Sequence, residues 1–270
     1  MNRKRTASTD RLTVIAIAVI AYAGVNVCHE IVGHCGMAAI LGTRCIQISS
    51  TNIPLITFPP AWKYNIIVIA GSSANWAVGL VCLGLLRALR TTRTTPALRY
   101  FLWLSMCVNL FLASTYMTAA PIIKYGDSYI LIRELPGQLF WRSALVLAGG
   151  ALCWFSFQIC RTELSRLIGF GGRAAREVAW ELVVPAYIIG GVVTVTSALF
   201  SQLDFKIAQL QAAGGTFGLT AWLLLLPLCI PEAPASAEHP FIIPRSIWWI
   251  VAGALVGLIF IGVLGPGIVL

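Results

Sequence analysis

The sequence alternates between long apolar runs and short polar or basic connections. Seven apolar runs are long enough, or nearly long enough, to cross about 30 Å of hydrocarbon as helices. They cover residues 12–41, 64–86, 98–120, 143–160, 182–203, 216–230 and 247–268. The run at 216–230 is short and ends near two prolines, so it is expected to cross the membrane only in part. The pattern predicts an all-α polytopic membrane protein with six or seven transmembrane helices.

Composition agrees with this class. Hydrophobic residues make up 58% of the 270 positions and charged residues only 11%. A soluble domain of this composition would lack the polar surface needed to cover itself. No stretch outside the apolar runs is long enough to form another domain, so residues 1–270 are expected to form a single membrane domain.

The net charge of +9 is distributed in a way that predicts topology. If the amino terminus is cytoplasmic, 13 of the 19 Lys and Arg residues lie on the cytoplasmic side, in groups at 3–11, 87–99, 161–176 and 245. This bias is the one expected of a multi-pass protein of the cell membrane with a cytoplasmic amino terminus. No basic stripe is interleaved with aromatic residues, so the partner is the lipid bilayer and not nucleic acid.

The polar connection at 43–64 contains three prolines and a short alternating segment at 45–49. Period-two alternation is typical of a strand, so a small β-hairpin with a free edge at the membrane surface is one expectation. An irregular loop is the other. Six cysteines inside the runs show no paired spacing and are expected to be packing residues: Cys28, Cys35, Cys82, Cys107, Cys153 and Cys160.

The first apolar run contains His29, Glu30 and His34, two of the three histidines of the chain. Glu30 is the one acidic residue in the interior of these runs, where an acidic side chain costs about 2.5–3.5 kcal/mol. A bound divalent metal would compensate this cost. A buried hydrogen-bonded or ion-paired polar cluster is the alternative, and Cys28 and Cys35 leave open a thiolate ligand.

The spacing of the histidines is unusual for a zinc site. His29 and His34 are five positions apart, which on a regular α-helix separates them by about 140°. A π-bulge would reduce the difference to about 50°, and such bulges concentrate at functional sites. Gly33 lies inside the interval and would ease the distortion. The H-E-x-x-x-H pattern is similar to the zinc motif of the dipeptidyl peptidase III family.

The order of motifs along the first 130 residues resembles the site-2 protease family of intramembrane zinc metallopeptidases. The His-Glu motif is followed one run later by Ala-Gly-Ser-Ser-Ala-Asn at 70–75, similar to the Gly-x-x-x-Asn segment of that family. Asn109 and then Pro-Ile-Ile-Lys-Tyr-Gly-Asp at 121–127 follow. The chain departs from the family in its histidine spacing, in Ser72 where proline is usual, and in Gly-Asp-Ser where Asp-Gly is usual.

The resemblance implies a zinc ion held by His29, His34 and Asp127, with Glu30 as the general base. The metal-site core would then cover about 12–135, and helices at 143–268 would complete the domain. Glu134, Asp204 and His239 compete with Asp127 as the third ligand. With seven spans, the ends of the first and third helices emerge on one face, which favours Asp127 and places His239 on the opposite face.

Asn75 and Asn109 are expected to bind substrate or the oxyanion, or else to join helices by hydrogen bonds. The expected function is hydrolysis of a peptide bond in a membrane protein substrate, within or next to a transmembrane segment. A membrane zinc amidohydrolase acting on a lipid is an alternative. A non-catalytic membrane scaffold or metal-binding protein is another.

Overall fold

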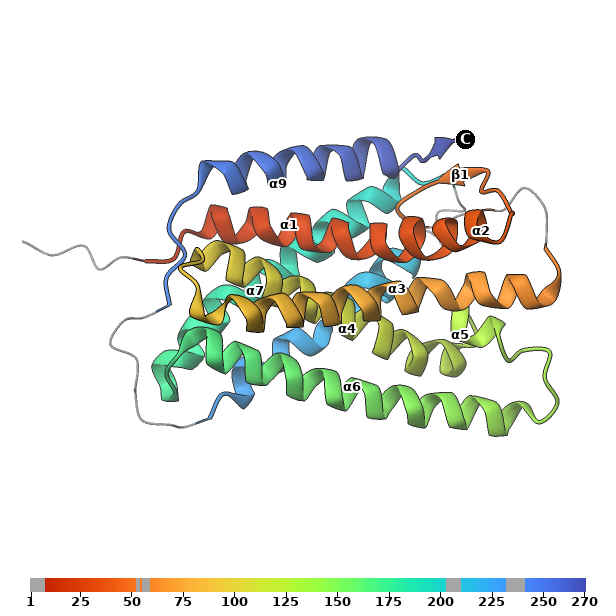
Figure 1. The fold of residues 1–270 in the computed structure, drawn as a ribbon, viewed down its shortest axis with the longest axis horizontal. Helices are drawn as coiled ribbons and strands as arrows, with labels where there is room; N and C mark the ends of the chain where they lie inside the picture. Colours follow the sequence, from red (N-terminus) through yellow and green to blue (C-terminus); the bar gives the residue numbers. More distant parts are fainter. Residues whose placement is uncertain (1–7, 52–53, 55–58, 203–209, 232–240) are drawn as a thin grey trace, which may run out of the picture.

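The computed structural model of the chain describes residues 8–51, 54, 59–202, 210–231 and 241–270 (Figure 1). Within these residues, six helices are long and apolar enough to cross a membrane, and a pair bent by 42° at 211–229 would make a seventh span. The protein is therefore an all-α polytopic membrane protein, as predicted.

The described elements in chain order are α1 (Arg11–Val27), η1 (Cys28–Cys35), α2 (Gly36–Ile40), β1 (Gln47–Ile48), α3 (Ala61–Ala88), η2 (Leu89–Thr91), α4 (Pro96–Ile123), α5 (Asp127–Ile130), α6 (Gln138–Ile168), α7 (Gly172–Leu199), η3 (Leu210–Phe217), η4 (Ala221–Leu225), η5 (Pro227–Cys229), α9 (Ile247–Ile259), η6 (Phe260–Leu264) and β2 (Ile268–Val269).

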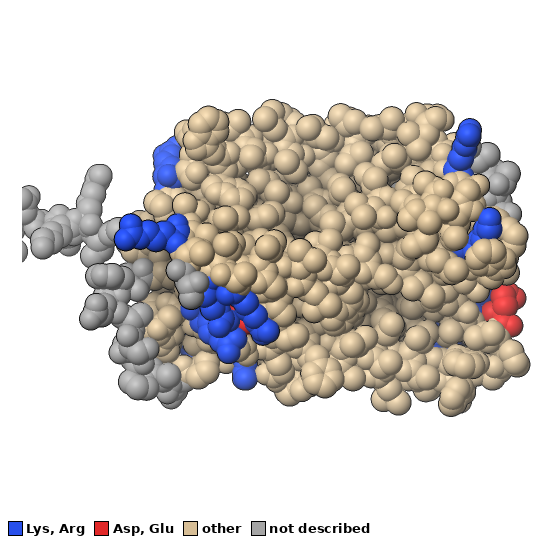
Figure 2. Space-filling model, viewed as in Figure 1, with Lys and Arg blue, Asp and Glu red and all other residues tan. Residues whose placement is uncertain are grey.

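Charged side chains lie at the two ends of the bundle, and the visible face between them is an uncharged band (Figure 2). This is the distribution required of helices whose middle portions lie in hydrocarbon. α1, η1 and α2 form one continuous span from Arg11 to Ile40. The short run predicted at 216–230 is the bent pair, Gln211–Phe217 and Ala221–Cys229.

α4 lies at the centre of the bundle and packs against α1, α3 and α6. Its Tyr100, Trp103 and Phe111 are fully buried. The polar ends of the first two are satisfied by main-chain carbonyls, since the Tyr100 hydroxyl donates to Leu182 O at 2.8 Å and Trp103 Nε1 donates to Cys160 O at 3.1 Å. α4 therefore holds the spans around it in a fixed arrangement.

Close contacts at small residues bring α1 against α7 and α9. A Cβ added to Gly253 of α9 would lie 2.7 Å from Ala16 Cα, so no larger residue fits there. Gly190 of α7 packs directly against the ring of Tyr22 in α1. Small residues at helix crossings are characteristic of membrane bundles, in which close backbone approach supplies the packing energy.

The strand expected at 45–49 is present as β1, and among the described residues it pairs with a strand from the far end of the chain and not with a second strand of a local hairpin. β1 pairs antiparallel with β2 from the far end of the chain, with Gln47 opposite Val269 and Ile48 opposite Ile268. Gln47 Nε2 also donates to Pro266 O at 2.9 Å. One edge of β1 is thus occupied by β2, which begins at the last residue of the predicted run at 247–268 and continues just beyond it.

Cys35 does not act as a simple packing residue, because it forms a disulfide with Cys45. This bond ties the end of η1 to the residues before β1, and it removes Cys35 from the possible thiolate ligands. The other five cysteines of the predicted runs are free, in agreement with the packing expectation.

α6 extends beyond the predicted run at 143–160 and ends at Ile168. The added turns contain Glu163, whose side chain is only 1% exposed. Three arginines bind it, at 3.0 Å from Arg87, 2.7 Å from Arg90 and 2.9 Å from Arg166. Glu30 remains the one acidic residue inside the predicted runs, but the longer helix α6 encloses Glu163 as well.

Candidate metal centre

The predicted π-helical distortion of the first span is confirmed. η1 (Cys28–Cys35) is a complete π-helical segment between the α-helical parts of the span. It brings the rings of His29 and His34 onto one side, with centroids 4.8 Å apart and planes at 89°. The five-residue spacing is thus accommodated by the wider turn and does not separate the imidazoles.

Gly33 is required where η1 meets α3. A Cβ at this position would lie 2.5 Å from Gly71 Cα and 2.8 Å from Ala70 O. Gly71 is required for a different reason, since an added Cβ would lie 2.6 Å from His34 Nε2 and 2.8 Å from His29 Nε2. Two glycines therefore let the backbone of α3 pass directly beside both imidazoles.

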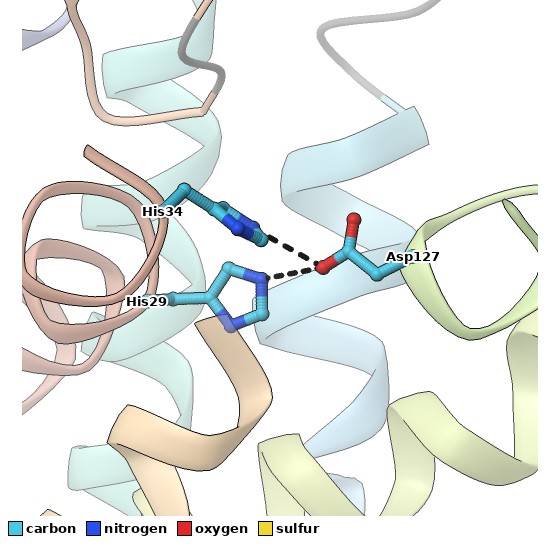
Figure 3. A group of neighbouring side chains, drawn as sticks. All are labelled: His29, His34 and Asp127. Carbon is cyan, nitrogen blue, oxygen red and sulfur yellow. Dashed lines mark hydrogen bonds and ion pairs between the residues drawn. The ribbon is translucent and has the colours of Figure 1, made fainter. Parts of the chain in front are cut away.

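A tight turn after α4 positions Asp127 next to the two histidines. Lys124 ends the helix in the left-handed conformation with φ 57°, and Gly126 follows with φ 96°. A positive φ suits glycine, which lacks the Cβ that would clash. α5 then begins at Asp127, and Figure 3 shows its carboxylate facing the two rings that project from η1.

The three side chains converge on a small volume. Asp127 Oδ2 lies 3.1 Å from His29 Nε2 and 3.2 Å from His34 Nε2 (Figure 3). Ligand atoms about 2.0–2.1 Å from a tetrahedral zinc ion lie about 3.3 Å from one another. The two distances are therefore close to those of ligands that share one zinc ion. The side chains are only 9%, 14% and 18% exposed for His29, His34 and Asp127, so water competes weakly for the site.

Hydrogen bonds on the far side of each ring fix the tautomer that a metal ligand needs. His29 Nδ1 lies 3.1 Å from Asn75 Oδ1, and His34 Nδ1 lies 2.7 Å from Ile67 O. Both partners are acceptors, so each Nδ1 donates its hydrogen and the neutral ring leaves a lone pair on Nε2. Two such lone pairs facing a carboxylate oxygen repel one another unless a cation lies between them. The donor set therefore fits a divalent metal, with protonation of the imidazoles as the competing state.

Protonation of the imidazoles, the competing state, would keep the Asp127 carboxyl charged. Burial opposes ionisation, but in that state the hydrogen bonds and positive charge of His29 and His34 outweigh burial and hold the pKa of Asp127 well below its usual range.

Asn75 and Asn109 lie behind the metal centre and form a chain that supports His29. Asn75 Nδ2 donates to Val25 O and to Asn109 Oδ1, both at 3.1 Å, while Asn109 Nδ2 donates to Ser105 O at 2.8 Å. Both hydrogens of the Asn75 amide are used in these bonds. The arrangement corresponds to the interhelical expectation and differs from that of an oxyanion donor.

The other candidates for the third ligand are placed elsewhere. Glu134 is exposed and pairs with Arg133 at 3.2 Å. Asp204 and His239 lie outside the described residues. Among the described His, Cys, Asp and Glu side chains, His29, His34 and Asp127 are the group whose atoms could hold one metal ion.

Glu30 is half-buried beside this group and lines cavities on two sides of it. None of the ion pairs among the described residues includes Glu30. One cavity, of about 250 Å³, is largely apolar and lies between α1, α4, α7 and η3. The other, of about 320 Å³, is more polar and reaches Lys124 and Arg133.

Sequence reasoning missed two residues at the meeting point of these cavities, Thr51 and Gln211. The Tyr116 ring also lies here and packs edge-on against His29 with centroids 5.7 Å apart.

Comparisons of the chain with protein-family models, with curated proteins and with solved structures find no match.

Proposed function

We propose that the protein is an intramembrane zinc metallopeptidase that hydrolyses a peptide bond in a membrane-embedded or membrane-adjacent substrate. The observation that carries the proposal is the convergence of His29, His34 and Asp127 on one point with Glu30 beside them. Two imidazoles and a carboxylate are a common ligand set for catalytic zinc, which keeps one further position for water.

The residues divide the chemistry between them. A zinc ion in this centre would act as a Lewis acid and lower the pKa of its water to about 7. Glu30 accepts a proton from the attacking water and delivers it to the leaving nitrogen. Asn75 and the carbonyl of Ile67 hold the two rings in the required tautomer and orientation.

The surroundings suit a substrate drawn from the bilayer. The apolar cavity beside Glu30 has Leu112, Leu219 and Phe260 in its wall, and Asn26 and Thr194 also line it. The basic residues of the sequence support a cytoplasmic amino terminus in the cell membrane. The metal centre then lies toward the opposite side of that membrane.

The test is cleavage of membrane proteins in reconstituted vesicles. Zinc-loaded protein is incorporated together with single-span membrane proteins extracted from the expression host, and new amino termini are detected by mass spectrometry. We expect cleavages that are present with the wild type and with Glu134→Gln, and absent with Glu30→Gln. Release of fatty acid from lipid amides without any new amino terminus would favour the lipid amidohydrolase instead.

A further inference from the structure

The two cavities beside the candidate metal centre have several lining residues in common, and the proposed reaction assigns no role to most of these residues. Both are lined by the same six residues: His29, Glu30, Thr51, Tyr116, Tyr125 and Gln211. The first two belong to the reaction centre. Gln211 is the one long amide side chain in the set, and it comes from η3, far from the metal motif in sequence.

One end of the Gln211 amide is held and the other is not. Its Nε2 donates to the Tyr125 hydroxyl at 3.2 Å. Its Oε1 is buried and has no hydrogen-bond partner among the described residues. Turning the amide over would only exchange the two ends, so one polar atom lacks a partner either way. A buried acceptor without a donor is costly, and such groups require an explanation in terms of strain, function or a missing ligand.

The local structure of η3 opens space next to this amide. The segment is π-helical, and Gln211 is followed by Ala212, Ala213, Gly214 and Gly215. A Cβ added to Gly215 would meet nothing within 4 Å. One turn later, Thr216 Oγ1 donates to Asn26 Oδ1 at 2.6 Å, which fixes η3 to α1. Gln211 is therefore held at the rim of a space that the described residues do not fill.

We propose that Gln211 binds a main-chain amide of a peptide substrate, while the apolar cavity takes the side chain next to the bond that is cleaved. This inference rests on the proposed function and narrows its substrate class to peptides. The Gln211 carboxamide offers its unpaired Oε1 as an acceptor and its second Nε2 hydrogen as a donor, and a peptide main chain presents the complementary pair at every residue. A lipid amide carries its amide only at the bond to be cleaved and offers Gln211 nothing further along its acyl chain.

Recognition of this kind discriminates strongly, because a site built around a hydrogen bond rejects an analogue that leaves its polar group unpaired. Tyr125 contributes by orienting the amide, so its hydroxyl is a positioning group. Leu112, Leu219 and Phe260 provide the apolar surface for the neighbouring substrate side chain.

The test compares two zinc-directed probes on the zinc-loaded, full-length protein in detergent. One probe is a leucyl-leucine hydroxamate, which carries a peptide amide, and the other is octanoyl hydroxamic acid, which carries only an acyl chain. Gln211→Met keeps the length of the side chain and removes its amide. We expect this variant to bind the peptide probe about tenfold more weakly, since one buried hydrogen bond is lost, and to bind the acyl probe as the wild type does.

Gln158→Met is the matched control, because Gln158 lies in α6 and lines neither cavity. It should leave both affinities unchanged. Tyr125→Phe should weaken only the peptide probe, by about threefold, a loss smaller than that of Gln211→Met because the amide remains.

Three results would overturn the inference. Unchanged affinity of Gln211→Met for the peptide probe would show that the amide binds no main chain. Equal loss for both probes would assign Gln211 a structural role. If neither probe binds the zinc-loaded wild type, the metal centre itself is wrong, and the inference fails together with the proposed function. Binding of the acyl probe to the wild type therefore distinguishes failure of the Gln211 inference alone from failure of the proposed metal centre.

Discussion

Two groups of ionisable side chains are enclosed near opposite ends of the bundle, and they are neutralised differently (Figure 1). Glu163, where α3 and α6 end, is bound by Arg87, Arg90 and Arg166. At the other group, no described Lys or Arg forms an ion pair with Glu30 or Asp127, and the Asp127 carboxylate lies against the imidazoles of His29 and His34. Arginines of the chain neutralise Glu163, whereas the side chains that meet at the other group are imidazoles and carboxylates.

The difference separates a structural role from a functional one. A carboxylate enclosed by fixed cations joins helices and has no free position for a ligand. A cluster of carboxylate and imidazole that has no Lys or Arg partner and lies beside a cavity has the properties of a site. Substitutions at the two groups should therefore have different consequences, one on the metal and the reaction and the other on folding.

The largest effect is expected from His34→Ala. Removal of one of three protein ligands should reduce bound zinc from about one ion per chain to nearly none, and hydrolysis should be lost with it. Metal analysis of purified protein, beside the exposed-site control Glu134→Gln, measures this. A variant that keeps stoichiometric zinc would contradict the assigned ligand set.

Glu30→Gln should lower the rate of hydrolysis by about 100- to 10,000-fold, the usual contribution of a general base. Zinc should remain bound, because Glu30 is not among the converging ligand atoms. Rate and metal content are to be measured on the same preparation. Unaltered activity would remove Glu30 from its assigned role.

Asn75→Leu should weaken zinc binding by about 10- to 100-fold, since groups that orient a ligating histidine contribute at this level. Competition with a zinc chelator gives the affinity. Ser156→Ala is the control, because it removes another buried hydrogen bond, to Ser114 at 3.0 Å, with no connection to His29. Equal affinities of the Asn75 and Ser156 variants would refute the orienting role.

Glu163→Gln should leave zinc content and hydrolysis unchanged and lower the free energy of unfolding by about 2 kcal/mol. The three arginines are 37–51% exposed, so water screens part of the charge that the substitution leaves behind. Thermal or denaturant unfolding in detergent measures this change in the free energy of unfolding. Glu177→Gln, at an exposed pair with Arg173, should have a smaller effect. Loss of zinc from Glu163→Gln would show that the two groups are not independent, and it would contradict the assignment of a purely structural role to Glu163.

Local patterns predicted most of the fold and of the metal motif. Apolar runs predicted the spans, because hydrocarbon imposes length and composition on each helix separately. The five-residue histidine spacing predicted the π-helix, since only a wider turn brings His29 and His34 together. Asp127 was chosen from motif order and from the alternation of helix direction, and the structure places it against both rings.

Contacts between distant parts of the chain could not be predicted in this way. β1 pairs with β2 some 220 residues later, and nothing in either short segment specifies the other. Glu163 was missed because it follows the predicted apolar run, and two of its three arginine partners, Arg87 and Arg90, come from elements distant in sequence. Gln211 lies just before the short run at 216–230, and its amide gains significance only when η3 packs beside Glu30.

Zinc K-edge X-ray absorption on the purified wild-type protein tests the central claim most directly. We predict one zinc ion bound by two imidazole nitrogens and oxygen at about 2.0–2.1 Å, with the imidazole signal lost in His34→Ala. Zinc bound through sulfur at about 2.3 Å, or a correctly folded protein that binds no zinc, would contradict it.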